Sequence, residues 1–238
     1  MALDDQRFDD RAELVGTARL LALSDGIFAI AATLLVLNLN PTLPFVAPDN
    51  KSQSIGAIGA YVLSFVIVGT FWLSHHRLFN TIWRADARLL ALNIAFLFFV
   101  SALPFVTAVL NDDEHHHYDG TQVYAGTLAL MALVELAMWL YACAGRRLVP
   151  ADLPRRVVIS RSLGMGAAAL VFATSIPIAI FVNADLAKYW WLLLIPIGAV
   201  LRRVFHTRGM TYEPAPPPAP STAPASPSPP PPRSTTRA

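Results

Sequence analysis

The fold is decided by residues 19–39, which read RLLALSDGIFAIAATLLVLNL. Only Arg19 and Asp25 in this run carry a charge. An α-helix rises 1.5 Å per residue, so about 20 residues cross the roughly 30 Å of hydrocarbon in a bilayer. The run is too long for the apolar core of a signal peptide, and the segment before it is acidic rather than basic. It therefore predicts a retained transmembrane helix.

Five further apolar runs follow the first. They are predicted at residues 55–74, 89–110, 122–144, 161–182 and 187–204. Backbone amides inside hydrocarbon must find partners within their own element, and the runs lack the two-residue alternation of a barrel strand, so we expect helices. Overall, 55% of the residues are hydrophobic and 14% are charged, too few charges to cover a water-soluble surface. The predicted fold class is an all-α membrane protein with six transmembrane helices per subunit.

The arginines and lysines predict how the helices are oriented. Of the 18 basic residues, all but Lys51 and Lys188 fall at or before the start of the first span, at or after the end of the last span, or in and beside the second and fourth loops. Basic residues are retained on the cytoplasmic side of a membrane, so both termini are predicted to be cytoplasmic. This clustering also explains the net charge of +2, and no nucleic-acid partner is expected.

The chain divides into three predicted parts. Residues 1–18 form a cytoplasmic N-terminal segment, residues 19–204 the transmembrane domain, and residues 205–238 a disordered, proline-rich cytoplasmic tail. His115–His117 follow Asp112, Asp113 and Glu114 in the third loop, and we interpret this stretch as a solvated outer loop rather than a metal site. No cofactor is predicted, and the single Cys143 excludes an internal disulfide.

A few polar residues lie within the predicted spans. An ionisable group there costs about 2.5–3.5 kcal/mol on insertion scales, so each needs a reason. Asp25 is too far from Arg19 along the helix for a direct pair, and we expect its partner on another helix, among His75, His76 and Asn93. These groups either pin three helices together or form a titrating relay through Asp25 and His76. Glu135 lies midway along the fourth span, and the sequence does not determine its role.

One stripe of the first helix combines aliphatic side chains with a hydroxyl. Ile30, Thr33 and Leu37 are spaced i, i+3 and i+7, so they share a face. If copies of this helix surround an axis, the stripe makes a ring of hydroxyls between two aliphatic rings. Such apolar constrictions close channels by excluding water.

Three motifs resemble a known family. They are Arg19-x-x-x-Leu23-Ser24-Asp25 with the following Gly-x-Phe-Ala-Ile-Ala-x-Thr-Leu-Leu, Phe-Trp-x-x-His75-His76-Arg-x-Phe, and Asn93 with Leu103-Pro104-Phe105. Together they resemble the bacterial branch of the transmembrane-protein-175 family, the endosomal and lysosomal potassium channels and their prokaryotic relatives. The likeness covers about residues 17–110 by motif and the remaining spans by count only.

The resemblance implies a homotetramer in the bacterial inner membrane, with the first helix of each subunit lining a pore for K⁺ and other monovalent cations. It assigns the hydrophobic gate to Ile30, the hydroxyl that favours potassium to Thr33, and a second apolar ring to Leu37. It gives a helix-clamping role to Arg19, Ser24, Asp25, Trp72, His76 and Asn93. The family's phenylalanine is Leu23 here, which retains an apolar side chain without the ring.

Two other classes of function compete with a channel. A proton-coupled secondary transporter would use Asp25 or Glu135 as the coupling carboxylate, but the two halves of the chain show no convincing repeat of the kind such transporters often carry. A membrane enzyme is not predicted, since the spans offer neither a nucleophile–base pair nor a metal triad. The chain also lacks a Thr-Val-Gly-Tyr-Gly filter, so we expect only modest preference for K⁺ over Na⁺.

Overall fold

The computed structural model describes residues 2–39, 51–111, 117–146 and 148–205, and its regular elements there are all helical. In chain order they are α1 (Ala2–Leu34), the 3₁₀ turn η1 (Leu35–Asn38), α2 (Lys51–Phe79), α3 (Ala87–Asn111), α4 (His117–Cys143), the 3₁₀ turn η3 (Ala144–Arg146), α5 (Arg155–Phe181), α6 (Ala184–Trp190), the 3₁₀ turn η4 (Trp191–Leu193) and α7 (Leu194–Val204).

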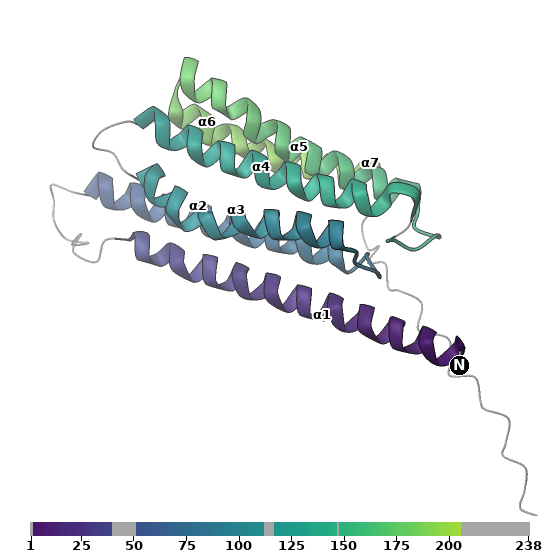
Figure 1. Cartoon of the computed structure of the whole chain (residues 1–238). Helices are drawn as coiled ribbons and strands as arrows, with labels where there is room; N and C mark the ends of the chain where they lie inside the picture. The colour runs from purple at the N-terminus through teal and green to yellow at the C-terminus, as the bar shows by residue number, and fades with distance from the viewer. Residues whose placement is uncertain (1, 40–50, 112–116, 147, 206–238) are drawn as a thin grey trace, which may run out of the picture.

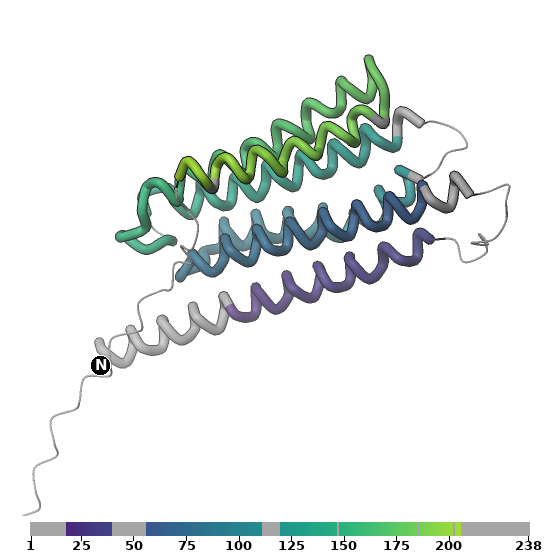
Figure 2. The backbone as a smooth tube through the Cα atoms, turned by 180° about the vertical axis from the view of Figure 1, so that it is seen from behind, coloured from purple at the N-terminus to yellow at the C-terminus, as the bar shows by residue number. Residues whose placement is uncertain are grey.

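The helices lie side by side in three layers (Figure 1). Helix α1 occupies one edge, α2 and α3 form the middle layer, and α4 to α7 form the far layer, an arrangement that is also visible from behind (Figure 2). Helix α3 packs against α1 on one side and α4 on the other. The core between the layers is filled by large side chains such as Phe96, Tyr124 and Trp139, all fully buried. Among the described helices, α1 therefore packs against the middle layer.

Five helices are long and apolar enough to cross a bilayer: Ala18–Asn38, Gly56–Phe79, Ala87–Leu110, Gly120–Arg146 and Arg155–Phe181. The predicted class of all-helical membrane protein is confirmed. The sixth predicted span, 187–204, differs from the others. Its helix is interrupted by the 3₁₀ turn Trp191–Leu193, and its apolar part, Leu186–Leu201, is shorter than the roughly 20 residues that cross a bilayer. The structure thus has five long apolar helices and a shorter one.

Several helix ends differ from the predicted boundaries. Helix α2 continues through His75 and His76 to Phe79, and α5 begins at Arg155, well before the predicted start at 161. Helix α1 already begins at Ala2, within the segment predicted as a separate N-terminal part. Hydropathy reports where side chains suit hydrocarbon, whereas Arg, Glu, Gln and Ala continue a helix readily beyond that zone. The spans predicted at 55–74 and 161–182 were therefore shorter than α2 and α5.

The loops between helices are short at one end of the bundle. Between α2 and α3, Asp86 caps the start of α3 by accepting a hydrogen bond from the backbone N–H of Leu89 at 2.9 Å. The acidic and histidine-rich stretch 112–116 and most of the predicted tail 205–238 lie outside the described residues.

Both described ends of the chain lie at the same end of the bundle. The start of α1 and the end of α7 point toward the same end of the bundle in Figure 1. The loops after α2 and after α4 share this end, because successive helices run in opposite directions. The bundle thus gathers the termini and the arginine-rich loops at one end.

Candidate pore-lining face and helix-clamping cluster

Helix α1 has two distinct faces. One face is buried and contains Leu20, Ser24, Phe28, Ala31 and Leu35, spaced i, i+4, i+8, i+11 and i+15 as one side of a helix requires. It packs against α2 and α3. The opposite face of α1 has no neighbouring helix among the described residues, since α1 lies at the edge of the bundle (Figure 1).

The three residues predicted for the gate, the hydroxyl ring and the second apolar ring all lie on the exposed side. Ile30 is 60% exposed and Leu37 is 73% exposed, values far above those of core residues. Thr33 is also exposed. Leu37 lies within the 3₁₀ turn Leu35–Asn38 rather than in the continuous α-helix predicted to residue 39. A 3₁₀ turn has 3.0 residues per turn, so Leu37 does not extend the stripe at regular α-helical spacing.

The Thr33 hydroxyl is oriented by its own helix. It lies 3.0 Å from the carbonyl oxygen of Ala29 and 2.9 Å from that of Ile30, and it donates its proton to these acceptors. A hydroxyl has one proton and two acceptor lone pairs, so the lone pairs remain for another donor or a cation. The exposed face of α1 therefore presents an oxygen acceptor between aliphatic side chains.

A buried chain of hydrogen bonds fastens α1 to the middle layer. His75 Nε2 lies 2.8 Å from Asn93 Oδ1, Asn93 Nδ2 donates to Ser24 Oγ at 3.1 Å, and Ser24 Oγ donates to the carbonyl oxygen of Leu20 at 2.9 Å. Ser24, His75 and Asn93 are buried and come from α1, α2 and α3 respectively. Since the Asn93 oxygen accepts, His75 carries a proton on Nε2.

Aromatic rings enclose the His75 imidazole. It stacks on Phe96 with an interplanar angle of 9° and a centroid distance of 5.4 Å, and it lies 4.5 Å from the ring of Phe79 and 5.6 Å from that of Phe28. Its Nδ1 has no hydrogen-bond partner among the described residues. The ring thus has one polar contact, to Asn93, and apolar surroundings otherwise.

A second connection joins α1 to α2 at the surface. Trp72 Nε1 donates to Asp25 Oδ1 at 2.9 Å, and the His76 ring stacks on Trp72 with centroids 5.6 Å apart. Asp25 was expected to bond with His75, His76 or Asn93, and these partners were wrong. Asp25 follows Ser24 by about 100° around the helix. Ser24 therefore faces α3 while Asp25 turns toward the edge of α2, where Trp72 reaches it.

Two motif residues lie apart from this cluster. Arg19 is exposed and makes no hydrogen bond or ion pair in the described part of the chain. Leu23 is 52% exposed, so the position where the family has phenylalanine packs little within the subunit. The structure brings together Ser24, His75 and Asn93, and separately Asp25, Trp72 and His76. The sequence suggested His75 as a possible hydrogen-bond donor. Its position at the centre of the cluster could not be predicted, because residue spacing does not show which side chains are buried.

Glu135 lies in the middle of α4, away from α1. Its side chain is buried, and it is hydrogen-bonded to the Ser74 side chain of α2. Its Oε1 has no partner among the described residues. The described residues also contain no group of three His, Cys, Asp or Glu side chains that could hold a metal ion.

Comparison with known proteins identifies the family. The model of the endosomal/lysosomal potassium channel TMEM175 matches residues 19–104, which run from the start of the motif in α1 to Pro104 in α3. A potassium channel of Streptomyces collinus is 30% identical over 196 residues, covering 76% of this chain and 94% of that protein. The chain belongs to the TMEM175 family. The resemblance seen in the motifs is thereby confirmed, and since this is a family of ion channels the chain is not an enzyme.

Two further TMEM175 proteins show how widely the likeness extends. The crystal structure of a TMEM175 homologue from Chamaesiphon minutus, described as a lysosomal potassium-selective channel homologue, superposes with a TM-score of 0.66 at 26% identity and covers 79% of this chain and 98% of that one. The Bos taurus protein named an endosomal/lysosomal proton channel is 30% identical over 144 residues, covering 55% of this chain and 30% of that protein. The family match thus includes proteins named for potassium and for protons.

Proposed function

We propose that this chain is one subunit of a potassium-permeable cation channel, in which the α1 helices of four subunits line a central pore. The observation that carries the proposal is the exposed face of α1, which presents Ile30, Thr33 and Leu37 on the side opposite the clamp. A single subunit has only one such helix at its edge, so it cannot surround a pore with it. The potassium channels among its relatives support this reading.

In the proposed channel, Ile30 forms the gate and Leu37 a further apolar ring. Aliphatic side chains that converge on an axis dewet a narrow passage, and an ion that must shed water cannot cross it. Opening then requires α1 to move or rotate so that these side chains withdraw from the axis. The hydrogen bonds at Ser24 and Asp25 support a fixed rotational position of α1, because a shift of one residue turns the helix by about 100°.

Thr33 is proposed to favour potassium. Its proton is engaged by the backbone carbonyls of Ala29 and Ile30, so four copies would offer oxygen lone pairs to a cation that has lost part of its water. A ring of flexible side chains resolves ions less sharply than a fixed cage of carbonyls. The preference for K⁺ over Na⁺ should therefore be modest.

The test is to replace Thr33 by alanine and measure the reversal potential under a potassium/sodium gradient. We expect Thr33→Ala to shift the potential toward a less selective value. Thr127→Ala is the matched control, because the Thr127 hydroxyl makes the same bond to its own helix, to Val123 at 2.9 Å, in the layer farthest from α1. An unchanged potential in Thr33→Ala would refute the proposed role.

The channel is proposed to lie in the bacterial inner membrane with both termini cytoplasmic. The termini and the loops rich in arginine share one end of the bundle, which agrees with the retention of basic residues inside the cell. This arrangement needs α6, η4 and α7 together to complete a sixth crossing despite their short apolar part.

A proton-coupled transporter is the second candidate. Glu135 favours it, because a buried carboxyl with an unpartnered oxygen is costly unless it is neutral or has a function. Asp25 is the other carboxylate considered, but it is exposed and bonded to Trp72.

Potassium flux in liposomes separates the two candidates. The channel predicts uncoupled, ohmic flux that persists in Glu135→Gln, since glutamine has the same shape and can still bond to Ser74. The transporter predicts saturating flux coupled to protons, which Glu135→Gln would abolish. Purified protein under an imposed potassium gradient, with and without a proton gradient, gives the measurement.

A further inference from the structure

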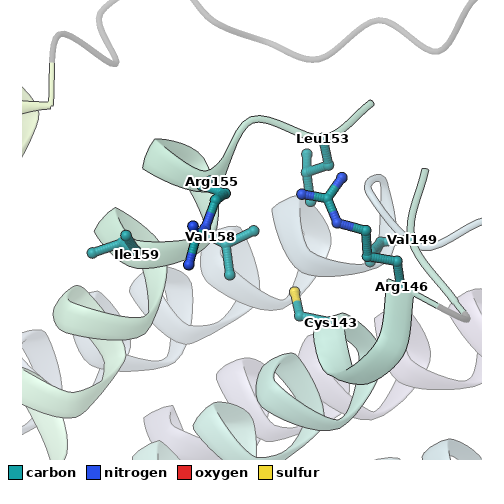
Figure 3. A pocket seen from close by; sticks show the side chains of 7 residues that line it. All are labelled: Cys143, Arg146, Val149, Leu153, Arg155, Val158 and Ile159. Atoms are coloured by element: carbon teal, nitrogen blue, oxygen red, sulfur yellow. The ribbon is translucent and has the colours of Figure 1, made fainter. Parts of the chain in front are cut away.

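We propose that a cavity between the ends of α4 and α5 binds the phosphate of an anionic phospholipid. The cavity has a volume of about 240 Å³, well above the roughly 15 Å³ that a single water needs. Arg146 and Arg155 line it on opposite sides, with the Cys143 sulfur between them (Figure 3). The remaining lining residues are apolar: Val149, Leu153, Val158 and Ile159.

The side chains that line this cavity include two basic groups and no acidic one. The first turn of α5 also contains no acidic residue, although it begins with Arg155 and Arg156. Basic side chains at the start of a helix are unfavourable, because that end of the helix dipole is already positive. Pro154 at the N-cap makes no side-chain hydrogen bond that would offset this. A phosphodiester in the cavity would bring one negative charge close to both guanidinium groups and to the positive helix end.

The backbone before the cavity is arranged to hold Arg146 there. Gly145 has φ 62° and Arg146 φ 53°, and the left-handed region is uncommon for a residue other than glycine. Arg146 Nη1 donates to the carbonyl oxygen of Ala151 across the loop. A guanidinium has five N–H donors, so most remain for a ligand. Arg155 is exposed and has no partner in the described part of the chain.

The position of the cavity fits a lipid headgroup rather than a soluble ligand. It lies where the apolar spans Gly120–Arg146 and Arg155–Phe181 end, at the level of the loop that contains Trp83. Trp83 is 59% exposed and its backbone N–H donates to the Leu148 carbonyl at 3.2 Å. Exposed tryptophans are typical of the membrane interface, and basic pockets between helices on the cytoplasmic side bind anionic headgroups.

An apolar track continues from the cavity along α5. Ile159 lines the cavity and is 45% exposed, and Leu163 and Leu170 follow at i+4 and i+11 with 48% and 64% exposure. These positions share one face of the helix, so an acyl chain can lie along it. The layer that contains α4 and α5 is farthest from α1, on the outside of a channel built around α1. The site needs the bilayer but not the pore, and its test is independent of conduction.

The experiment compares the lipids bound to two cavity variants and one control variant of the full-length protein. Arg155→Gln and the double variant Arg146→Gln/Arg155→Gln remove cavity charge, whereas Arg88→Gln/Arg203→Gln removes two exposed arginines outside the cavity. Native mass spectrometry with added phosphatidylglycerol should show one fewer retained lipid per subunit in the double variant than in the control. We expect about fivefold weaker binding per arginine, from the contribution of a basic residue near an anionic surface.

Thermal unfolding in detergent supplies the second measurement. Phosphatidylglycerol should raise the melting temperature of the parent and the control but not that of the double variant. Equal stabilisation by inorganic phosphate would identify a free-anion site and overturn the lipid assignment. Equal lipid retention in Arg155→Gln and the control would overturn the site. Arg155→Gln remains informative if loss of the Arg146 contact with the loop impairs folding.

Discussion

Individual polar residues fix how α1 sits on the bundle. Ser24 and Asp25 are adjacent in sequence, yet one binds Asn93 of α3 and the other binds Trp72 of α2. Because neighbouring residues are about 100° apart on a helix, the two hydrogen bonds hold α1 from two directions. A single hydrogen bond would hold α1 against its neighbours but would resist rotation less. The Ser-Asp pair therefore has a geometric reason to occur as a dipeptide.

Replacing Asn93 by alanine should destabilise the subunit. The change removes the partners of both His75 and Ser24 in a buried site. Hydrogen bonds between membrane helices average roughly 0.6 kcal/mol and reach about 1.7, so we expect a loss of about 1–2 kcal/mol in the free energy of unfolding. Denaturant unfolding in detergent measures it.

Ser101→Ala is the control for this loss. The Ser101 hydroxyl lies on the exposed side of the same helix and donates only to the carbonyl of Phe98. We expect its effect to stay within about 0.5 kcal/mol, as for most surface substitutions. If Asn93→Ala were as stable as Ser101→Ala, the buried chain of hydrogen bonds would not hold α1.

At the scale of helices, the sequence predicted which helices are present better than it predicted where each one begins and ends. Five long apolar helices could be predicted because runs of hydrocarbon-compatible residues are unambiguous, but the ends of α2 and α5 could not. Arg161 illustrates the reason. Predicted at the first residue of a span, it lies inside α5, donates to the Arg77 carbonyl at 3.1 Å and to Thr81 at 2.7 Å, and covers the Trp139 ring at 5.0 Å. A charged residue with such partners can lie within a helix, although a prediction from hydropathy places the boundary of the helix at that residue.

The pairing of polar groups on different helices could also not be predicted from the sequence. Ser64, Thr107 and Tyr124 connect α2, α3 and α4 through hydroxyl contacts of 2.9 and 3.0 Å. None of them was singled out, because a lone hydroxyl in an apolar run costs little and has no fixed partner. The candidate gate residues could be listed from a stripe and a resemblance. Their exposure depends on which face of α1 packs against the other helices. The sequence of α1 is apolar on all sides and does not determine that face.

The two faces of α1 predict a pattern of chemical accessibility. Cysteines introduced singly at Ile30, Thr33 or Leu37 should react with a water-soluble thiol reagent in the open channel and reduce the current. Cysteines at Ala31 or Leu35, which are buried, should not. The background should carry Cys143→Ser, because Cys143 is only partly buried. Equal modification on both faces would contradict a pore lined by the exposed face.

On the scale of the whole molecule, the bundle consists of successive layers that start with α1 at one edge. Helix α1 is supported by α2 and α3, and these in turn rest on the layer of α4 to α7 (Figure 1). The family match ends at residue 104, within the second of these layers. The layer farthest from α1 thus supplies support and, in our proposal, the contact with anionic lipid.

The oligomer should contain four copies. The subunit has a mass of 25.9 kDa, and native mass spectrometry of the detergent-purified protein should give four times that value. Substituting Asn93 should weaken the assembly indirectly, whereas Arg155→Gln should leave it intact. A stable monomer or dimer that still conducts would contradict a pore formed by four α1 helices.

The separation of the two faces of α1 has a consequence for evolution. Ile30, Thr33 and Leu37 contribute little to the packed interior of the subunit, so substitutions there are nearly free of folding constraint. Ser24 and Asn93, by contrast, are tied to partners on other helices. A lineage could therefore change which ion passes through a few exchanges on one side of a single helix, while its subunit architecture is inherited unaltered.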